Sequence, residues 1–543
     1  MDDIKTAKRI WLWSIGALIT AAVLKGLLLW MDVVPFNSDE AVVALMGRHI
    51  LQGQRPIFFY GQAYMGSLDT YLIALGFAML GQQVWVIRLV QAVLYLGTLM
   101  TTVMLGKMAF RSMQVGILAA WLMAIPVVNV TLYTTASLGG YGEALLIGNI
   151  IILLTLRIAN LLDAQNSKLF GDWLAWGFLA GFGVWVFGLT LVYTIPAGIF
   201  LAIYLHKASN ARTSLLLATI GAVIGLAPWW GFTIRHGLAA PIAELGGSAI
   251  AGVEGLPYLQ QVWQHLTSLL LLGSTVIFGL RPPWGVTLLG IPLMPFVLAF
   301  WVMVLMHVFR QPINHRAKNG KLLFSGVMLA VVLAFIFTPF GADPSGRYFL
   351  PLTTPLALYA ADWVVSLRNT YPDHSLGRRS WVLVVLVLAF NLWGTLQSAL
   401  NYPPGLTTQF NPVTQVDQRS MPALIAFLRQ HSELRGYTNY WAAYPLAFLS
   451  AEELVYIPRL PYHQDFRYTR RDDRYLPYGE TISQADRVAY VTTENPPLDE
   501  YLQAQFFSLG ALWKETWIGD FHVFYEMSRL VRPEDIGLGM TTP

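Results

Sequence analysis

Long apolar runs separated by short polar segments cover the chain from residue 10 to residue 398. The first run, 10–31, is long enough to cross the roughly 30 Å hydrocarbon core of a bilayer, and it lacks a small-residue cleavage site. The pattern predicts an α-helical polytopic membrane protein whose first helix is retained. Twelve further runs follow, at 67–80, 84–109, 113–133, 141–160, 170–188, 190–206, 213–233, 262–280, 286–309, 322–339, 348–367 and 381–398.

Two of these runs are predicted to lie at the outer interface of the membrane instead of crossing it. The run 67–80 is short and carries Asp69, and the run 262–280 follows a polar loop and ends in Arg-Pro-Pro. Both features suit interfacial helices. About eleven spans remain by the criterion of roughly 20 residues per span.

The basic residues predict the orientation. Lys5, Lys8 and Arg9 precede the first span, and with eleven spans most of the other Lys and Arg residues fall in or beside loops on the same side. Because cytoplasmic loops are enriched in positive charge, the N-terminus is expected in the cytoplasm of a plasma (inner) membrane protein. Residues 32–83 then form the first outer loop, and residues 399–543 lie on the exoplasmic side of the membrane.

Residues 399–543 have the pattern of a water-soluble α/β domain. Helical stretches at 422–431, 442–453 and 498–506 alternate with extended stretches at 436–441, 454–458, 487–493, 512–519 and 522–527. Residues 1–398 contain 23 Lys+Arg and 14 Asp+Glu, whereas this shorter tail contains 12 and 17. The chain is therefore expected to consist of a membrane domain, 1–398, and an exoplasmic domain, 399–543.

Composition excludes several classes of function. Hydrophobic residues make up 55% of the chain and charged residues only 12%, which excludes a soluble multidomain enzyme. The absence of cysteine excludes disulfides, thiolate chemistry and iron–sulfur clusters. Neither half has a basic patch with interleaved aromatics, so no nucleic-acid partner is expected. The tail lacks nucleotide-binding glycine motifs and is interpreted as a recognition or lid element. Its segment 461–480, rich in Tyr, Arg and Asp, is either a carbohydrate or acceptor surface or a solvated loop.

Acidic residues near a membrane are costly and mark candidate functional positions. Asp39 and Glu40 directly follow the first span and begin a predicted helix, which Ser38 or Asp39 could cap. A cap alone does not account for the aromatic and amide-rich sequence FFYGQAYMGSLDTYL that follows, which is typical of a binding cleft. The acids predicted at the outer side are Asp32, Asp39, Glu40, Asp69, Glu143, Glu244, Glu254 and Asp343.

The SDE motif at 38–40, the FFYGQAYMGSLDTYL loop and the Arg88-Leu89 pair that introduces the next long run resemble the GT-C superfamily of polytopic glycosyltransferases. The order of motifs is most similar to the branch of protein O-mannosyltransferases and lipid A aminoarabinose transferases. A second match is GRYFLP, where Arg347, Tyr348 and Pro351 enter a late span.

The resemblance implies transfer of a sugar from a polyprenyl-phosphate donor to an acceptor at the outer face. Asp39 is then expected to be the general base, and Glu40 to orient the acceptor or pair with a cation. Arg347, with Tyr348, is expected to bind the donor phosphate, although pairing of Arg347 with Asp343 is an equally good interpretation. The residues expected to line the sugar or acceptor site are Tyr60, Gln62, Tyr64, Asp69 and Glu143.

No cofactor is expected, and a His-based metal centre has no support because the histidines form no H-x-x-x-H pair. A divalent cation on Asp39 and Glu40 is the alternative left open. The alternative function is a multispan lipid or solute transporter or flippase, which would carry polar residues at mid-bilayer in two related halves. A third interpretation is a membrane-anchored binding protein whose function resides in the tail. The acceptor is left open among protein, lipid and polysaccharide.

Overall fold

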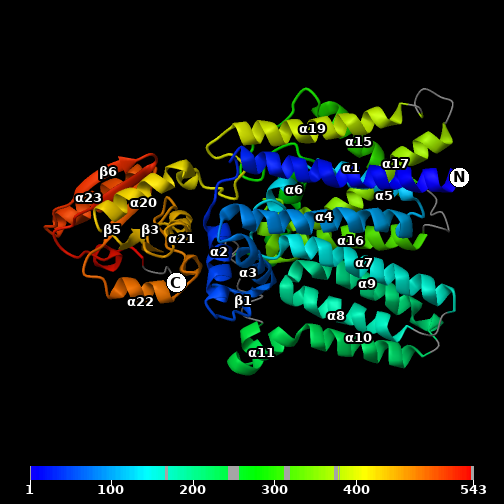
Figure 1. Cartoon of the computed structure of the whole chain (residues 1–543), viewed down its shortest axis with the longest axis horizontal. Coiled ribbons are helices and arrows are strands. Elements are labelled where there is room, and N and C mark those ends of the chain that lie inside the picture. The colour runs from blue at the N-terminus through cyan, green and yellow to red at the C-terminus, as the bar shows by residue number, and fades with distance from the viewer. Residues whose placement is uncertain are drawn as a thin grey trace. The chain divides into compact units, whose positions relative to one another are not determined.

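The computed structural model is mostly helical (Figure 1) and describes residues 2–165, 169–208, 210–241, 256–310, 318–371, 377 and 379–539. It divides into two compact units. The first consists of Met1–Met31, Tyr64–Leu68 and Arg88–Ser398. The second consists of Asp32–Ala63, Asp69–Ile87 and Ala399–Pro543.

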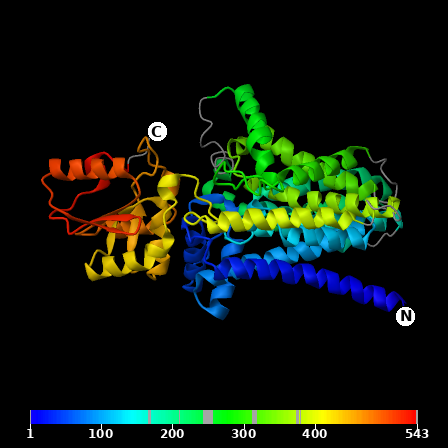
Figure 2. The same cartoon turned by 90° about the horizontal axis from the view of Figure 1, so that it is seen from above.

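The first unit is a bundle of helices whose long members lie side by side with roughly aligned axes (Figures 1 and 2). Many of their large apolar side chains, such as Ile199 and Ile203, are exposed, as expected where lipid is the solvent. The helices are α1 (Asp2–Trp30), α4 (Val84–Ala109), α5 (Met113–Ala124), α6 (Val128–Tyr133), α7 (Tyr141–Asp163), α8 (Phe170–Val186), α9 (Leu191–Tyr204), α10 (Ala211–Gly225), α11 (Ala227–His236), α13 (Tyr258–Ser268), α14 (Ser274–Ile277), α15 (Met294–Arg310), α16 (Lys318–Phe337), α17 (Thr353–Thr370) and α19 (Ser380–Leu400).

Several of these helices are long and apolar enough to cross a membrane. Within the described residues there are seven, or eight if the bent pair α10 and α11 forms one span. The protein is therefore a multi-pass membrane protein. Three of the runs predicted to span contain helices that are shorter than those counted above: α5 has 12 residues, and α8 and α15 have 17 each. The total of about eleven spans, the interfacial placement of 67–80 and 262–280, and the orientation stay predictions.

Glycines bring α8 and α10 into close contact. A Cβ atom added at Gly177 would lie 1.9 Å from the backbone oxygen of Ala218, and one added at Gly221 would lie 2.2 Å from that of Leu174. The same relation recurs one turn further along, at Gly181 and Gly225. Small residues are the usual means by which membrane helices pack backbone to backbone.

The second unit contains the α/β domain that the sequence predicts. Its sheet has the order β4-β3-β5-β7-β6, in which β3 pairs in parallel with β4 and β5, and β7 pairs antiparallel with β5 and β6. The strands are β3 (Arg435–Thr438), β4 (Val455–Pro458), β5 (Ala489–Thr493), β6 (Lys514–Ile518) and β7 (Phe521–Tyr525). The helices are α20 (Met421–Gln430), α21 (Tyr440–Leu449), α22 (Pro477–Ser483) and α23 (Pro496–Ser508).

Side chains alternate between the two faces of this sheet, as a strand period of two requires. Val491 and Val523 join a core with α20 and α21, including Leu424 and Leu446. On the opposite face the ring of Phe506, from α23, lies 5.0 Å from the ring of Tyr490. Figure 2 shows the sheet between helices on both sides.

Residues of the predicted first outer loop also belong to the second unit. They form α2 (Ser38–Leu51), the short strand β1 (Phe58–Phe59) and, from Asp69 onward, α3 (Leu68–Leu80). The short strand β2 (Gln62–Gly66) has Gln62 and Ala63 in this unit and its remaining residues in the first unit. Helix α2 packs on α21. Near its start, the Asn37 side chain donates to Thr408 Oγ1 at 2.7 Å, and the backbone N–H of Leu406 donates to the carbonyl oxygen of Val33 at 2.8 Å.

Candidate active site

Asp39 lies in the first turn of α2 but does not cap it. The N-cap is Asn37, whose side-chain oxygen accepts from the backbone N–H of Glu40 at 3.4 Å. The prediction that Ser38 or Asp39 caps this helix is therefore wrong. Ser38 Oγ donates to the backbone oxygen of Tyr440, and the Tyr440 hydroxyl donates to Oδ1 of Asp39 at 2.7 Å. The carboxylate of Asp39 is thus held by a residue of the tail.

Arg474 links Tyr440, the partner of this carboxylate, to Gln62 of the FFYGQAYMGSLDTYL segment. Its guanidinium carbon lies 5.3 Å from the centre of the Tyr440 ring. With the Gln62 amide in the orientation that satisfies both of its polar atoms, the amide oxygen accepts from Nη2 of Arg474 at 2.8 Å. Gly61, at φ +67°, makes this approach possible, since a Cβ there would lie 3.1 Å from Cδ of Arg474. The structure therefore brings the predicted residues Asp39 and Gln62 into one network.

Tyr60 belongs to a second network, at the other end of α2. Its hydroxyl donates to Gln54 at 2.6 Å and lies 3.0 Å from Nδ1 of His49. Nε2 of His49 in turn lies 3.0 Å from Oε1 of Glu452, beside Arg48. The Tyr60 hydroxyl therefore has two protein partners. Its role in sugar binding stays a prediction.

Glu40 and Asp69 are almost completely buried in the second unit, Asp69 in the first turn of α3. These positions neither support nor contradict the roles predicted for Glu40 and Asp69. Two of the outer acids, Glu244 and Glu254, lie outside the described residues.

In the first unit, Arg347 begins a 3-10 turn, Arg347–Leu352, that continues into α17. The preceding Gly346 has φ +97°, and its carbonyl oxygen accepts from the Asn129 side chain at 3.0 Å. Nη2 of Arg347 lies 2.5 Å from Oδ2 of Asp343, so the predicted ion pair is present. The Arg347 side chain is 37% exposed.

Tyrosines surround Arg347. Its charge acts on Tyr133, Tyr141 and Tyr348, and Tyr64 interacts electrostatically with Tyr141 and Tyr348. Phenol rings and hydroxyls of this kind suit the apolar faces and hydroxyl groups of a sugar. The buried carboxyl group of Glu143 lies in the first turn of α7, two residues after Tyr141. Four predicted site residues, Arg347, Tyr348, Tyr64 and Glu143, therefore belong to the first unit.

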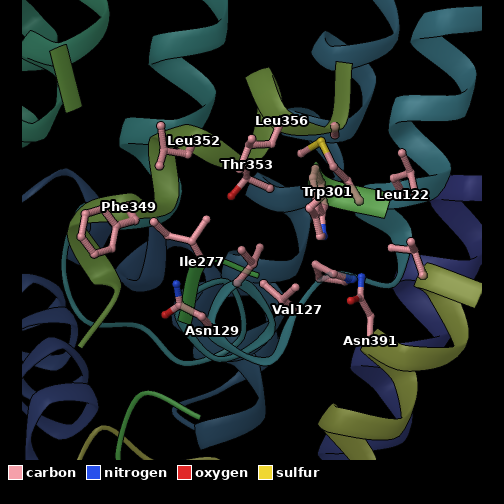
Figure 3. A pocket seen from close by; sticks show the side chains of 15 residues that line it. Leu122, Val127, Asn129, Ile277, Trp301, Phe349, Leu352, Thr353, Leu356 and Asn391 are labelled. Carbon is pink, nitrogen blue, oxygen red and sulfur yellow. The ribbon is translucent and has the colours of Figure 1, made fainter. Parts of the chain in front are cut away.

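An apolar cavity adjoins this turn (Figure 3). Its polar lining includes Asn129, which also holds Gly346, and Asn391, which donates to the backbone oxygen of Ile125 at 2.9 Å. The other lining residues are mostly apolar and come from six helices, the loop between α5 and α6, and the turn that begins with Arg347; among them are Val127, Ile277, Trp301, Phe349, Leu352 and Leu356.

The described part of the chain contains no cluster of potential metal ligands, since no three His, Asp or Glu side chains come together there. The expectation that the reaction needs no cofactor stays a prediction.

Sequence reasoning did not identify Tyr440 or Arg474. The sequence pattern places Tyr440 in an extended stretch, 436–441, whereas in the structure it begins α21. Arg474 lies within the segment 461–480, whose density of Tyr, Arg and Asp was the available signal.

Comparison with known proteins identifies the fold. No protein-family model matches the sequence, and no curated protein matches it. Among solved structures, ArnT from Cupriavidus metallidurans bound to undecaprenyl phosphate aligns with a TM-score of 0.54 at 11% identity, over 97% of this chain and 99% of that chain. The archaeal oligosaccharyltransferase AglB from Archaeoglobus fulgidus, in complex with an inhibitory peptide and a dolichol phosphate, aligns with a TM-score of 0.50 at 13% identity, over 94% and 74% of the two chains.

The chain has the GT-C fold. Both solved structures are GT-C superfamily members, and the alignments extend over most of the chain, including the tail. The fold expected from the SDE, FFYGQAYMGSLDTYL and GRYFLP motifs is therefore confirmed. In this chain the three motifs contain Asp39, Gln62 and Arg347, respectively.

Proposed function

We propose that this GT-C protein is a glycosyltransferase that moves a hexosyl or pentosyl group from a polyprenyl-phosphate-linked donor to an acceptor at the outer face of the plasma (inner) membrane. The observation that carries the proposal is the likeness, over nearly the whole chain, to a structure bound to undecaprenyl phosphate. The likeness to a structure with a dolichol phosphate adds support, because that ligand is also a lipid phosphate. The acceptor is a protein, lipid or polysaccharide.

Asp39 serves as the general base. An acceptor group must lose a proton as it attacks the anomeric carbon, and a carboxylate within hydrogen-bond reach can take that proton. The hydrogen bond from Tyr440 fixes the orientation of the Asp39 carboxylate. Glu40 and Gln62 orient the acceptor and sugar near this carboxylate, with Tyr60 and Asp69 as further candidates.

Arg347 serves as the ligand of the donor phosphate. The leaving group is a lipid phosphate, and a guanidinium offers it two parallel charge-assisted hydrogen bonds. Tyr348 and Tyr64 line the sugar side of this site, with Glu143 nearby in the first unit. The apolar cavity of Figure 3 accommodates part of the isoprenoid chain, since its lining is hydrophobic and adjoins the turn that begins with Arg347.

The test is a transfer assay on isolated membranes containing the full chain. Undecaprenyl phosphates carrying labelled hexoses or pentoses are supplied one at a time, and release of undecaprenyl phosphate is measured with transfer of label to the membrane fraction. The wild-type chain should use at least one donor, and Asp39→Asn should insert normally yet lose transfer. An Asp39→Asn variant with full activity would remove Asp39 as the base. Failure of every donor would contradict the proposed reaction.

A further inference from the structure

The peptide unit that joins Gly346 to Arg347 is held by two hydrogen bonds. Its carbonyl oxygen, that of Gly346, accepts from the Asn129 side chain at 3.0 Å and from the backbone N–H of Phe349 at 3.0 Å. Because a peptide unit is planar, these bonds also fix the plane from which the backbone of Arg347 begins. Asn129 therefore acts on the backbone that carries the Arg347 side chain.

The backbone at Gly346 lies directly against its neighbours. Its φ is +97°, a conformation that glycine adopts readily and other residues rarely. A Cβ atom there would lie 2.3 Å from Cγ1 of Val276, in α14, and 2.9 Å from Oδ1 of Asn129, in α6. The peptide therefore has little room to turn while Asn129 is in place.

The residues ahead of this peptide are held by a different side chain, that of Arg281. Nη2 of Arg281 donates to the backbone oxygen of Pro344 at 3.2 Å. Its other N–H groups donate to Thr275 and to further backbone oxygens of the same region. Arg281 thus fixes the start of the turn, whereas Asn129 fixes the peptide that leads into Arg347.

The Asn129 side chain is buried in the lining of the apolar cavity (Figure 3). Its Nδ2 donates to Gly346, and its Oδ1 has no hydrogen-bond partner among the residues that the structure describes. A buried amide oxygen without a partner lowers stability. Stability alone therefore does not favour an amide in this lining, and the bond to Gly346 is the contact that requires one.

We propose that Asn129 is a positioning residue for the lipid-phosphate donor, because through the Gly346 carbonyl it orients Arg347. The inference rests on the proposed function, since it presupposes that Arg347 binds the donor phosphate. With its backbone held by Asn129 and its guanidinium paired with Asp343, Arg347 has fewer conformations to lose when the phosphate binds. Loss of the Asn129 amide should weaken donor binding and leave the chemical step unchanged.

The test is the steady-state kinetics of Asn129→Ala in the membrane transfer assay, at varied donor concentration. The KM for the donor should rise about tenfold, the effect of losing one hydrogen bond that supports binding, whereas kcat should stay at the wild-type value. A purely structural defect would instead lower the amount of active protein, and with it the apparent kcat, at an unchanged KM. Asn129→Leu, which keeps the bulk of the side chain, should raise the KM to a similar extent.

Asn391→Ala is the matched control. Asn391 lines the same cavity, is also buried, and donates to the backbone oxygen of Ile125 at 2.9 Å. Its removal therefore costs the cavity a comparable amide and hydrogen bond, but the backbone group that it holds does not adjoin Arg347. The KM of Asn391→Ala should stay at the wild-type value. Equal increases for the Asn129 and Asn391 variants would overturn the inference, because the cause would then be the cavity.

A double substitution separates this inference from the function on which it rests. In the Arg347→Ala background, Asn129→Ala should not raise the KM again, because the two residues act through one contact with the donor. A further rise there would overturn the positioning role, as would a wild-type KM for Asn129→Ala beside a raised KM for Arg347→Ala. An unchanged KM for Arg347→Ala itself would instead overturn the phosphate role of Arg347.

Discussion

The hydroxyl group of Tyr440 donates a hydrogen bond of 2.7 Å to Oδ1 of Asp39, although the two residues are 401 positions apart in the chain. The bond links the first turn of a helix in the predicted outer loop to the first residue of a helix in the tail. The same tyrosine accepts the Ser38 hydroxyl on its backbone oxygen. The tail therefore contributes directly to the surroundings of the proposed base.

Tyr440→Phe should lower the rate of transfer about tenfold, because the hydrogen bond holds Oδ1 of Asp39 in one orientation and its loss lets the proposed base turn away from the acceptor. Steady-state rates in the membrane assay measure the change. Tyr437→Phe is a suitable control, because the Tyr437 ring lies against Tyr490 in the sheet, at 5.3 Å. An unchanged rate for Tyr440→Phe would show that this bond does not position Asp39 for the reaction.

Arg347→Ala should raise the KM for the lipid-phosphate donor about 10- to 100-fold, the effect of losing a hydrogen-bonded charge partner. Arg347→Lys should give an intermediate KM, because an ammonium keeps the charge but not the two parallel donors. Steady-state rates at varied donor concentration measure the change. Asp343→Asn serves as the comparison, since it frees Arg347 from its ion pair and should not weaken donor binding. An unchanged KM in Arg347→Ala would rule out the phosphate role.

Glu452→Gln should destabilise the second unit at neutral pH by about 1–3 kcal/mol. Burial alone would raise the pKa of Glu452, but hydrogen bonds from His49 and Tyr478 and the Arg48 charge lower it below its usual 4.5. The stabilisation is therefore complete above pH 4.5 and is lost as the pH falls through the lowered pKa. Denaturation of the solubilised full chain, followed by tryptophan fluorescence, should show the difference from wild type narrowing in acid.

The neighbouring residue provides the control for this measurement. Glu453 forms an exposed pair with Arg429 at 2.8 Å, so Glu453→Gln should change stability by less than about 1 kcal/mol. Equal effects of the two substitutions would contradict a special role for the Glu452 network.

Gly177→Ala should lower the thermal unfolding midpoint of the detergent-solubilised protein, because a Cβ atom would lie 1.9 Å from the backbone oxygen of Ala218. Relief of the overlap requires α8 and α10 to separate, at a cost of about 1–3 kcal/mol. Gly171→Ala, on the same helix with nothing within 4 Å of the added atom, should leave the midpoint unchanged or raise it slightly. A tolerated Gly177→Ala would mean that the two helices are less tightly packed than described.

Local periodicity in the sequence predicts the elements whose formation depends on neighbouring residues in the chain. Apolar length gives the membrane helices, and the alternation of Val491 and Tyr490 gives a strand with two covered faces. The GRYFLP and SDE motifs place Arg347 and Asp39 at the starts of helical segments, where the structure also has them. The number of spans is harder to predict, because α5 and α15 are shorter than the apolar runs that contain them.

The partners of the proposed base could not be predicted in the same way. Tyr440 and Arg474 reach Asp39 and Gln62 only through tertiary contacts of the tail, and no periodicity in the sequence records which distant segments meet. The N-cap of α2 shows the same limit on a smaller scale. Three successive residues, Asn37, Ser38 and Asp39, all have capping side chains, and the pairing of Ser38 and Asp39 with Tyr440 leaves Asn37 to cap the helix.

The second unit is assembled from three separate stretches of chain, 32–63, 69–87 and 399–543. Because Tyr440 follows Asp39 by 401 residues, a ribosome working at roughly 5–20 residues per second delivers it roughly 20–80 s later. During that interval the growing chain exposes Asp39 without its hydrogen-bond donor, while most of the membrane helices are still being inserted. The proposed catalytic carboxylate therefore acquires its working environment only after the tail has been synthesised, so a chain truncated before the tail would carry Asp39 without that environment.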